Sequence, residues 1–208
     1  MMLNKYSTIF WDFDGVILNS DEVRTEGFKY IFDGYSKEYI DKLVNYHTIN
    51  GGLSRYEKIE YFSQKILDTK LNNEEKKQYA QLYGNYCRER LCDKNLLIKN
   101  SISFIKENYK NFDFHLVSAS DEKELIYLCS NLDIKKYFKS ICGSPVNKIE
   151  NIKKLLKSNN YNESSCCLIG DSINDKFAAT KNKISFFGFN NIQLIKDSKY
   201  IHTFESLQ

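Results

Sequence analysis

The stretch Phe10-Trp11-Asp12-Phe13-Asp14-Gly15-Val16 begins within the apolar run Ser7-Thr8-Ile9-Phe10-Trp11, which predicts a buried strand ending at the first aspartate. Alternate residues of a strand point to the same side, so Asp12 and Asp14 can converge on one metal ion or one substrate group. Two carboxylates this close repel each other, and such a pair usually requires a cation or a shared proton. The stretch therefore predicts a polar site at the end of a core strand.

Three further segments carry residues that can complete this site. Ser118 follows a predicted strand at 112–117, Lys148 follows a short one at 140–143, and the run Gly170-Asp171-Ser172-Ile173-Asn174-Asp175 follows one at 166–169. Predicted helices alternate with these strands, which indicates a Rossmann-like α/β fold, a parallel sheet with helices on both faces. Such sheets bind ligands at the carboxyl ends of their strands. A helix cap or a surface lysine would explain each residue alone, but their common edge favours a functional site.

Composition limits the class of protein. The chain has 208 residues, 42% of them hydrophobic, which is enough for a sizeable core, and no apolar run is long enough to cross a membrane. Its 30 basic and 27 acidic residues leave a net charge of +3, too small and too dispersed to favour nucleic acid. Residues 1–6 lack the pattern of a signal peptide. We therefore expect a soluble cytoplasmic protein that binds neither nucleic acid nor a membrane.

The six cysteines do not form a recognisable framework. They include no C-x-x-C pair, and the spacing of Cys87, Cys92 and His115 does not suit zinc. We expect neither a disulfide nor a zinc site. Cys166 and Cys167 lie in the apolar run before Gly170, which predicts that at least one of them is a small core residue.

Residues 18–92, named here the helical segment, show helical periodicity and no convincing strand. Ser54 and Glu57 have the spacing of a capping box, which predicts a helix beginning there. Apolar residues at helical spacing form two further stripes, Ile40, Leu43, Val44 and His47, and Tyr79, Leu82, Tyr83 and Tyr86. The helical segment is therefore predicted to be a small helical bundle.

The aspartates suit phosphoryl transfer. A carboxylate such as Asp12 can attack phosphorus and form an aspartyl-phosphate, and a cation must offset the repulsion between the two anions. Mg²⁺ prefers oxygen ligands and uses few protein carboxylates; Asp12 and Asp171 can supply these, and Asp175 lies one helical turn beyond Asp171. Asp14 is then free to give a proton to the leaving oxygen and to take one from water.

The oxygens of a transferring phosphoryl group also need cationic and hydrogen-bonding partners. Lys148 can neutralise these oxygens. The Ser118 hydroxyl, together with the backbone amides beside Phe13 and Ala119, can donate hydrogen bonds to them. The residues together predict a phosphate and divalent-metal site.

In these segments the chain resembles the haloacid-dehalogenase-like (HAD) superfamily, in its phosphatase and phosphomutase branch. The matching pieces, in the family's order, are Asp12-Phe13-Asp14-Gly15-Val16, Val117-Ser118-Ala119-Ser120, Gly143-Ser144-Pro145-Val146-Asn147-Lys148 and Gly170-Asp171-Ser172-Ile173-Asn174-Asp175. They span the chain from residue 7 to about residue 190. Ile149 stands where the family often has a proline, and we expect this to change the loop and not the role of Lys148.

The resemblance implies a role for each matching residue. Asp12 would be the nucleophile, and Asp14 the acid and base. Ser118, Ala119 and Lys148 would hold the phosphate. The Mg²⁺ ligands would be Asp12, the Asp14 backbone carbonyl, Asp171 and Asp175. Family dehalogenases lack the second motif carboxylate, so Asp14 favours a phosphoester as substrate.

The resemblance also implies a division into two domains. The helical segment lies where this family inserts an all-helical cap, so residues 1–17 and 93–208 would form the α/β core and residues 18–92 the cap. A cap of this kind can close over the site and exclude water. The turn before Arg55 lies where the family places its specificity loop, and this makes Arg55 a candidate substrate contact. The alternative is a solvated arginine in the first turn of a helix.

We expect a phosphatase that acts on a small phosphomonoester, such as a sugar, polyol or amino-alcohol phosphate. One alternative is a sugar phosphomutase of the beta-phosphoglucomutase type, which needs a second phosphate site in the cap. Only Arg55 and Lys58 lie near the specificity loop, with no evident basic cluster, so hydrolysis is favoured. Another alternative is a phosphorylation-controlled signalling domain, but no acid ends a predicted strand between Asp14 and Ser118. A monomer and a homodimer are both compatible with the sequence.

Overall fold

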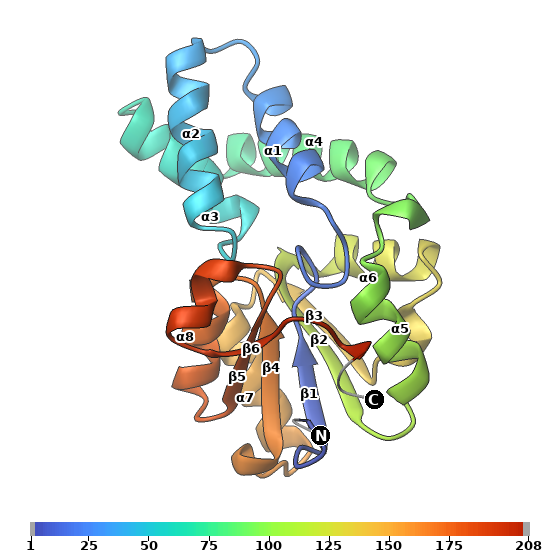
Figure 1. Ribbon diagram of the computed structural model, residues 1–208. Coiled ribbons are helices and arrows are strands. Elements are labelled where there is room, and N and C mark those ends of the chain that lie inside the picture. Colours follow the sequence, from blue (N-terminus) through green and yellow to red (C-terminus); the bar gives the residue numbers. More distant parts are fainter. Residues whose placement is uncertain (1–2, 206–208) are drawn as a thin grey trace.

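The computed structural model describes residues 3–205, and the outermost residues of the predicted core, 1–2 and 206–208, lie outside the described residues. Six parallel strands form one sheet in the order β3-β2-β1-β4-β5-β6 (Figure 1). The strands are β1 (Thr8–Trp11), β2 (Asp113–Asp121), β3 (Ser140–Ser144), β4 (Cys166–Gly170), β5 (Ser185–Phe189) and β6 (Lys199–Ile201). The predicted parallel α/β sheet is confirmed, and β6 is an addition that the sequence did not indicate.

Helices cover both faces of the sheet. The helices that follow the strands are α5 (Lys99–Asn108), α6 (Glu122–Asn131), α7 (Lys148–Ser158) and α8 (Ile173–Lys181). Alternation along β1 separates the faces: Ile9 and Trp11 belong to the buried cluster that includes α5 and α6, whereas Phe10 belongs to the cluster of α7 and α8. Short 3₁₀ turns span Lys94–Leu96, Lys135–Tyr137, Glu163–Ser165 and Ile192–Lys196.

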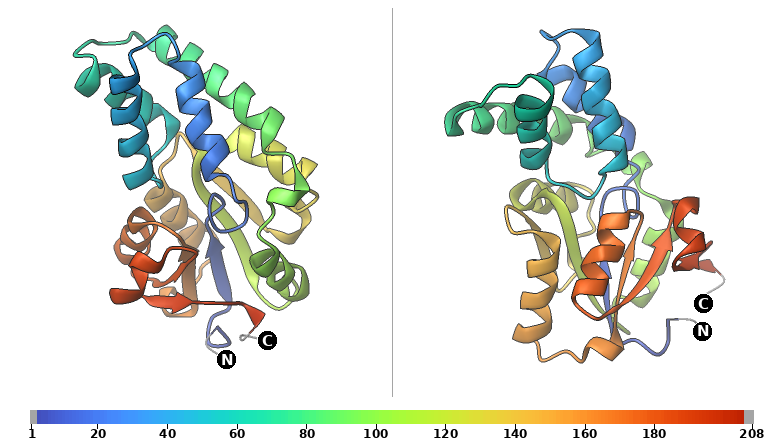
Figure 2. Two further views of the ribbon diagram at one scale, coloured as in Figure 1. Left: turned by 45° about the horizontal axis from the view of Figure 1, so that its top comes forward. Right: turned by 90° about the vertical axis from the view of Figure 1, so that its left-hand side faces the viewer.

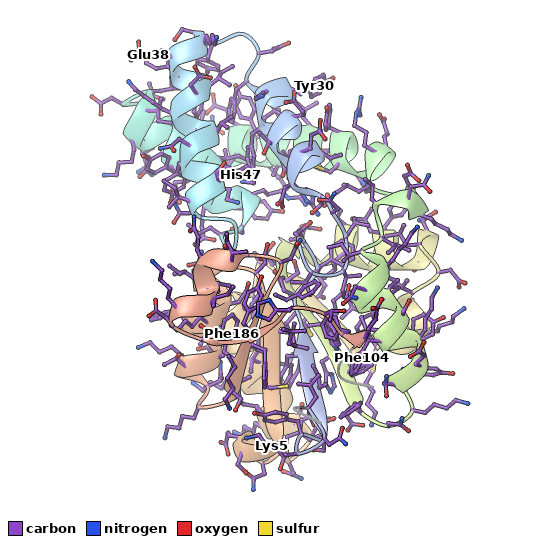
Figure 3. All side chains as sticks on the ribbon, viewed as in Figure 1. Lys5, Tyr30, Glu38, His47, Phe104 and Phe186 are labelled. Atoms are coloured by element: carbon purple, nitrogen blue, oxygen red, sulfur yellow. The ribbon has the colours of Figure 1, made fainter. Side chains whose placement is uncertain are left out.

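The helical segment lies over the carboxyl ends of the strands in every view (Figures 1 and 2). Its elements are α1 (Asp21–Ile31), α2 (Lys37–Ile49), α3 (Arg55–Tyr61), a π-helical turn (Phe62–Ile66) and α4 (Asn73–Arg90). Among the described residues no strand interrupts it, as predicted. Its bounds as a separate domain stay a prediction. Figure 3 shows Glu38 at the far end of α2 and His47 at the end near the sheet.

The start of α3 was predicted correctly, whereas the stripe predicted for α4 was correct only in part. Ser54 Oγ accepts from the Glu57 amide, and the Glu57 carboxylate accepts from the Ser54 amide, which completes the capping box. On α4, Tyr83 is buried and Tyr79 and Tyr86 pack against the core as predicted, but Leu82 is 47% exposed, and Ala80, Gly84 and Cys87 are buried as well. Gly84 faces Arg55, and an added Cβ would lie 2.7 Å from Nη1 of that arginine. Small residues that allow close approach set this face, and a count of large apolar residues misses them.

The structure shows the state of the cysteines and bears on whether a helix could span a membrane. Cys166 and Cys167 are both fully buried, as predicted for at least one of them. All six cysteines are free thiols. Within residues 3–205 no helix has both the length and the apolar character that a membrane span requires.

Candidate active site

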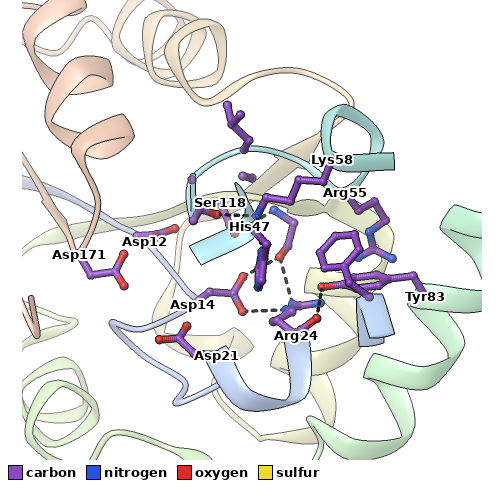
Figure 4. A pocket seen from close by; sticks show the side chains of 16 residues that line it. Asp12, Asp14, Asp21, Arg24, His47, Arg55, Lys58, Tyr83, Ser118 and Asp171 are labelled. Atoms are coloured by element: carbon purple, nitrogen blue, oxygen red, sulfur yellow. Dashed lines mark hydrogen bonds and ion pairs between the residues drawn. The ribbon is translucent and has the colours of Figure 1, made fainter. Parts of the chain in front are cut away.

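The sequence-predicted residues meet at the carboxyl edge of the sheet. Asp12 follows β1, Ser118 lies in β2, Lys148 opens α7 after β3, and Asp171 follows β4. A cavity of about 60 Å³ lies between this edge and the helical segment, and its walls include Asp12, Asp14, Ser118, Ala119, Arg55 and Asp171. Figure 4 shows these aspartates opposite side chains from the helical segment. Lys148 joins this group through its contacts with Asp12 and Asp175.

Gly15 explains why the first motif needs a glycine. Its φ of +73° lies in the left-handed region, which residues with a Cβ seldom adopt. A Cβ at this position would lie 2.0 Å from the Asp171 Oδ2 atom. The turn after Asp14 and the close approach of Asp171 therefore both depend on Gly15.

Strand β2 is longer than predicted. The sequence places its end at Ser118, but β2 continues to Asp121, with an irregular register against β3 between Val117 and Asp121. Such irregularities re-aim side chains at sheet edges. Ser118 and Ser120 are two positions apart and both line the cavity, and the Ser118 Oγ accepts from the Ser120 amide at 3.1 Å.

Lys148 joins the first and last motifs. Its Nζ donates to Asp12 Oδ1 at 2.8 Å and to Asp175 Oδ1, and all three side chains are buried. Burial opposes the charged ammonium, but Asp12 and Asp175 outweigh it and raise the Lys148 pKa above its ordinary value. The other Asp175 oxygen accepts from the amide and hydroxyl of Ser172 and so caps α8. Asp175 therefore binds Lys148 and also lies beside Asp12 and Asp171, the other two candidate metal ligands.

The residues present fit a divalent cation. One oxygen from each of Asp12, Asp171 and Asp175 lies within 4.8 Å of the other two. Burial and then repulsion from Asp12 and Asp175 raise the Asp171 pKa to about 9. Burial and repulsion from Asp175 also raise the Asp12 pKa, to about 7. Three carboxylates beside one ammonium leave an excess of negative charge that Mg²⁺, a hard cation with oxygen ligands, would offset.

Because of this excess of negative charge, the effect of Mg²⁺ on the stability of the fold should depend on pH. Folded Asp12 and Asp171 keep protons up to pH about 7 and about 9, whereas the unfolded chain loses them near 3.8. The folded state then binds more protons, so this contribution to stability falls as pH rises from 3.8 towards about 9. Because Mg²⁺ requires ionised carboxylates and relieves their repulsion, we expect it to raise the Tm more at about pH 8 than at about pH 5.

The measurement is thermal unfolding at both pH values, with Mg²⁺ and with EDTA. Asp171→Asn is the comparison variant, because it removes one like charge and one ligand. We expect it to lose most of the Mg²⁺-dependent rise in Tm at the higher pH. A rise that is the same in parent and variant would place the ion elsewhere.

Asp14 lies in a different environment from Asp12. Its Oδ1 accepts from Ser20 Oγ at 2.5 Å and from Arg24 Nε at 3.0 Å, and its Oδ2 accepts from Ser120 Oγ at 2.7 Å. Burial disfavours the ionised form of Asp14 and by itself would raise its pKa. The charge of Arg24 and these hydrogen bonds favour the ionised form more strongly, and together they lower the Asp14 pKa to about 2. The pKa values of Asp12 and Asp14 are thus shifted in opposite directions, although the two residues are only two positions apart. Such opposed shifts are common among titratable groups in active sites.

Arg55 is not a solvated arginine. Its side chain is 5% exposed, its Nη2 lies 2.7 Å from Glu124 Oε2, and its guanidinium lies over the ring of Tyr83. Glu124, from α6, also pairs with Arg24 Nη1 at 2.5 Å. One buried carboxylate of the core therefore joins two arginines of the helical segment, and one of these arginines also holds Asp14.

We expect Glu124→Gln to destabilise the protein by about 3–5 kcal/mol, because removing one partner leaves buried charges uncompensated. The measurement is urea unfolding of parent and variant. Glu26→Gln is the matched control, since Glu26 pairs with Lys29 on the surface and its loss should change the unfolding midpoint little. Equal midpoints for Glu124→Gln and the parent would contradict a structural role for this carboxylate.

Sequence reasoning missed several residues of the site. Ser20, Arg24 and Ser120 bind Asp14, and Glu124 binds two arginines. For Ser120 a signal existed, because it stands two positions after Ser118 and shares its side of the strand. Glu124 carried none, because its partners are 69 to 100 positions away in the sequence.

The chain matches a known protein family in sequence and known proteins in fold. The sequence profile of the haloacid dehalogenase-like hydrolases matches residues 9–189. No curated protein sequence matches the chain. Solved structures share the fold at low identity. Beta-phosphoglucomutase from Clostridium difficile has a TM-score of 0.79 at 19% identity, covering 98% of this chain and 93% of that one.

Two further similar structures contain a bound ligand. CbbY from Rhodobacter sphaeroides, in complex with phosphate, has a TM-score of 0.76 at 15% identity, covering 97% of this chain and 96% of that one. YfnB from Bacillus subtilis, bound to magnesium, has a TM-score of 0.71 at 16% identity, again covering 97% and 96%. At these identities the likeness concerns the fold.

Proposed function

The chain belongs to the haloacid dehalogenase-like hydrolases, and from that premise we propose that it is a Mg²⁺-dependent phosphatase of a small phosphomonoester. The observation that carries the proposal is the pair Asp12 and Asp14. Asp12 lies among carboxylates beside one lysine, whereas Asp14 is held ionised by an arginine. This difference supports Asp12 as the group that reacts at phosphorus and Asp14 as the group that moves protons.

In the proposed reaction Asp12 attacks the phosphorus atom and forms an aspartyl-phosphate. Lys148 neutralises charge on Asp12 and on the transferring oxygens, and the Ser118 hydroxyl and Ala119 amide donate to those oxygens. Mg²⁺ held by Asp12, the Asp14 carbonyl, Asp171 and Asp175 would supply the charge stabilisation that two approaching anions need.

Asp14 performs the proton transfers of the proposed reaction. It gives a proton to the leaving alcohol in the first half and takes one from the attacking water in the second. The ion pair with Arg24 keeps the free carboxyl ionised, so Asp14 already stands in the base form. Donation to an alcohol requires that Asp14 first gains a proton and that its contact with Arg24 loosens.

We propose that residues 18–92 act as a cap over this site. The cavity of about 60 Å³ has room for only a few water molecules, so a substrate enters when the helical segment moves away from the core. Gly52 lies against the core here, since an added Cβ would be 2.6 Å from the Asn174 side chain. We therefore interpret this arrangement as the closed one.

The expectation that the cap lacks a basic cluster is wrong. Arg24, Arg55 and Lys58 all line the cavity. Asp14 and Glu124 already pair with Arg24 and Arg55, however, so these two arginines are not free for a second phosphate. Hydrolysis thus remains the function that we propose, and a mutase the alternative.

The test is phosphate release from a panel of metabolite phosphomonoesters, with Mg²⁺ and with EDTA. The proposal predicts release that depends on Mg²⁺ and is lost in EDTA. Full turnover by the EDTA-stripped protein would refute the metal requirement. Conversion of a sugar phosphate to its isomer without release of phosphate would establish the mutase instead.

A further inference from the structure

Lys58, on α3, is a buried lysine without a carboxylate partner. Only 3% of its surface is exposed. Its Nζ lies 2.8 Å from His47 Nδ1 and 3.3 Å from the Gly51 carbonyl oxygen. Throughout the part of the chain that the structure describes, no carboxylate lies within ion-pairing distance of this Nζ. A buried ammonium in such surroundings is unfavourable unless an anion joins it.

The other buried cations near the site are matched. Lys148 pairs with Asp12 and Asp175, Arg24 with Asp14 and Glu124, and Arg55 with Glu124. Asp14, Asp21 and Glu57 act on Lys58 only from a distance. Of these buried cations, Lys58 alone has no short contact with a carboxylate.

The neighbours of Lys58 are suited to a protonated amine. Burial and the charge of Lys58 lower the His47 pKa to about 3, so the imidazole is neutral and its Nδ1 can accept from an ammonium. Burial lowers the Lys58 pKa to about 7, because the ammonium is disfavoured there without a compensating anion. An approaching anion would complete its surroundings.

Lys58 lines the same cavity as Asp12 and Ser118. In Figure 4 it extends from the helical segment towards the group formed by His47, Ser118 and Asp14. A ligand with its phosphoryl group at Asp12 would therefore extend towards Lys58. A second phosphate, with two negative charges, would need a further cation, but Arg24 and Arg55 are already paired, so the single charge of Lys58 matches a carboxylate better.

We propose that Lys58 binds a carboxylate of the substrate, so that the substrate is the phosphate ester of a small hydroxy acid. The proposal rests on the proposed phosphatase function and narrows its substrate class. It moves the specificity contact from Arg55, whose charge is already matched, to Lys58. It also disfavours amino-alcohol phosphates, which would bring a second ammonium to Lys58.

The experiment compares three sets of phosphate esters of equal chain length: two- to four-carbon hydroxy acids, their amides and the matching amino alcohols. An amide and a carboxylate have nearly the same shape, so the difference in kcat/KM between the two esters measures the effect of the negative charge. For the best chain length we expect kcat/KM to be about 10- to 100-fold higher for the acid than for the amide. The amine should be the poorest of the three.

Lys58→Met keeps the length of the side chain and removes its charge. Because Lys58 has no carboxylate partner, its replacement leaves no unpaired charge behind, and circular dichroism can check that the variant folds. We expect the preference for the acid over the amide to collapse to within a few-fold, through a higher KM for the acid. Lys65→Met is the control, because Lys65 is an exposed lysine of the same segment and should keep the preference.

The outcomes separate this inference from the proposed function. Release of phosphate from p-nitrophenyl phosphate without any preference for acids overturns the Lys58 proposal alone. An acid preference that survives in Lys58→Met also overturns it. No release from any ester overturns the proposed phosphatase and, with it, this inference.

Discussion

We expect Asp12→Asn to remove turnover almost completely while the chain stays folded. An amide cannot attack phosphorus, and the uncatalysed hydrolysis of phosphate monoesters is so slow that catalysed enhancements reach ~10²¹-fold. Loss of the proposed nucleophile should therefore leave little activity. The fold should not suffer, because the amide oxygen can still accept from Lys148, and the substitution removes a charge that Asp175 repels. We expect the Tm of the metal-free variant to match or exceed that of the parent.

Two measurements check this prediction. Phosphate release gives the loss of turnover, and mass spectrometry of acid-quenched protein shows whether a phosphoenzyme forms in the parent and not in Asp12→Asn. Asp41→Asn is the control for the chemical change, since Asp41 is an exposed residue of α2. Substantial turnover in a clean Asp12→Asn preparation would rule out the covalent mechanism.

The core of the site was predictable because it depends on local sequence. Strand ends at Asp12 and Asp171 follow short apolar runs, and a parallel sheet places such ends along one edge. The Ser54 capping box is local in the same sense and is confirmed. Each of these features depends on residues within a few positions of one another.

The surroundings of Asp14 were not predictable, because they depend on how the helical segment meets the core. Glu124 lies 100 positions after Arg24 and 69 after Arg55, and no spacing rule connects them. Lys58 was expected near the specificity loop, but its burial beside His47 at the cavity depends on the fold and not on local sequence. The face of α4 was predicted only in part for a related reason, since packing against Arg55 selects Gly84.

Asp14→Asn should slow turnover of alkyl phosphates by about 10²- to 10⁴-fold, the usual value of a positioned acid or base. The asparagine has nearly the same shape, and its oxygen can still accept from Ser20 and Arg24. Arg24 also keeps its ion pair with Glu124, so the variant should fold. What is lost is proton transfer, both to the leaving alcohol and from the attacking water.

The leaving group decides which half of the reaction limits Asp14→Asn. A p-nitrophenolate leaves without a proton, so the variant should form the phosphoenzyme from p-nitrophenyl phosphate and then hydrolyse it slowly, because water still needs a base. A stopped-flow burst of p-nitrophenol, equal to the enzyme concentration and followed by a slow steady state, is the expected result. An alkyl phosphate should give no burst, since its first step also lacks a proton. If Asp14→Asn instead hydrolyses its phosphoenzyme as fast as the parent does, Asp14 acts on the leaving group alone, and the base for water is another residue.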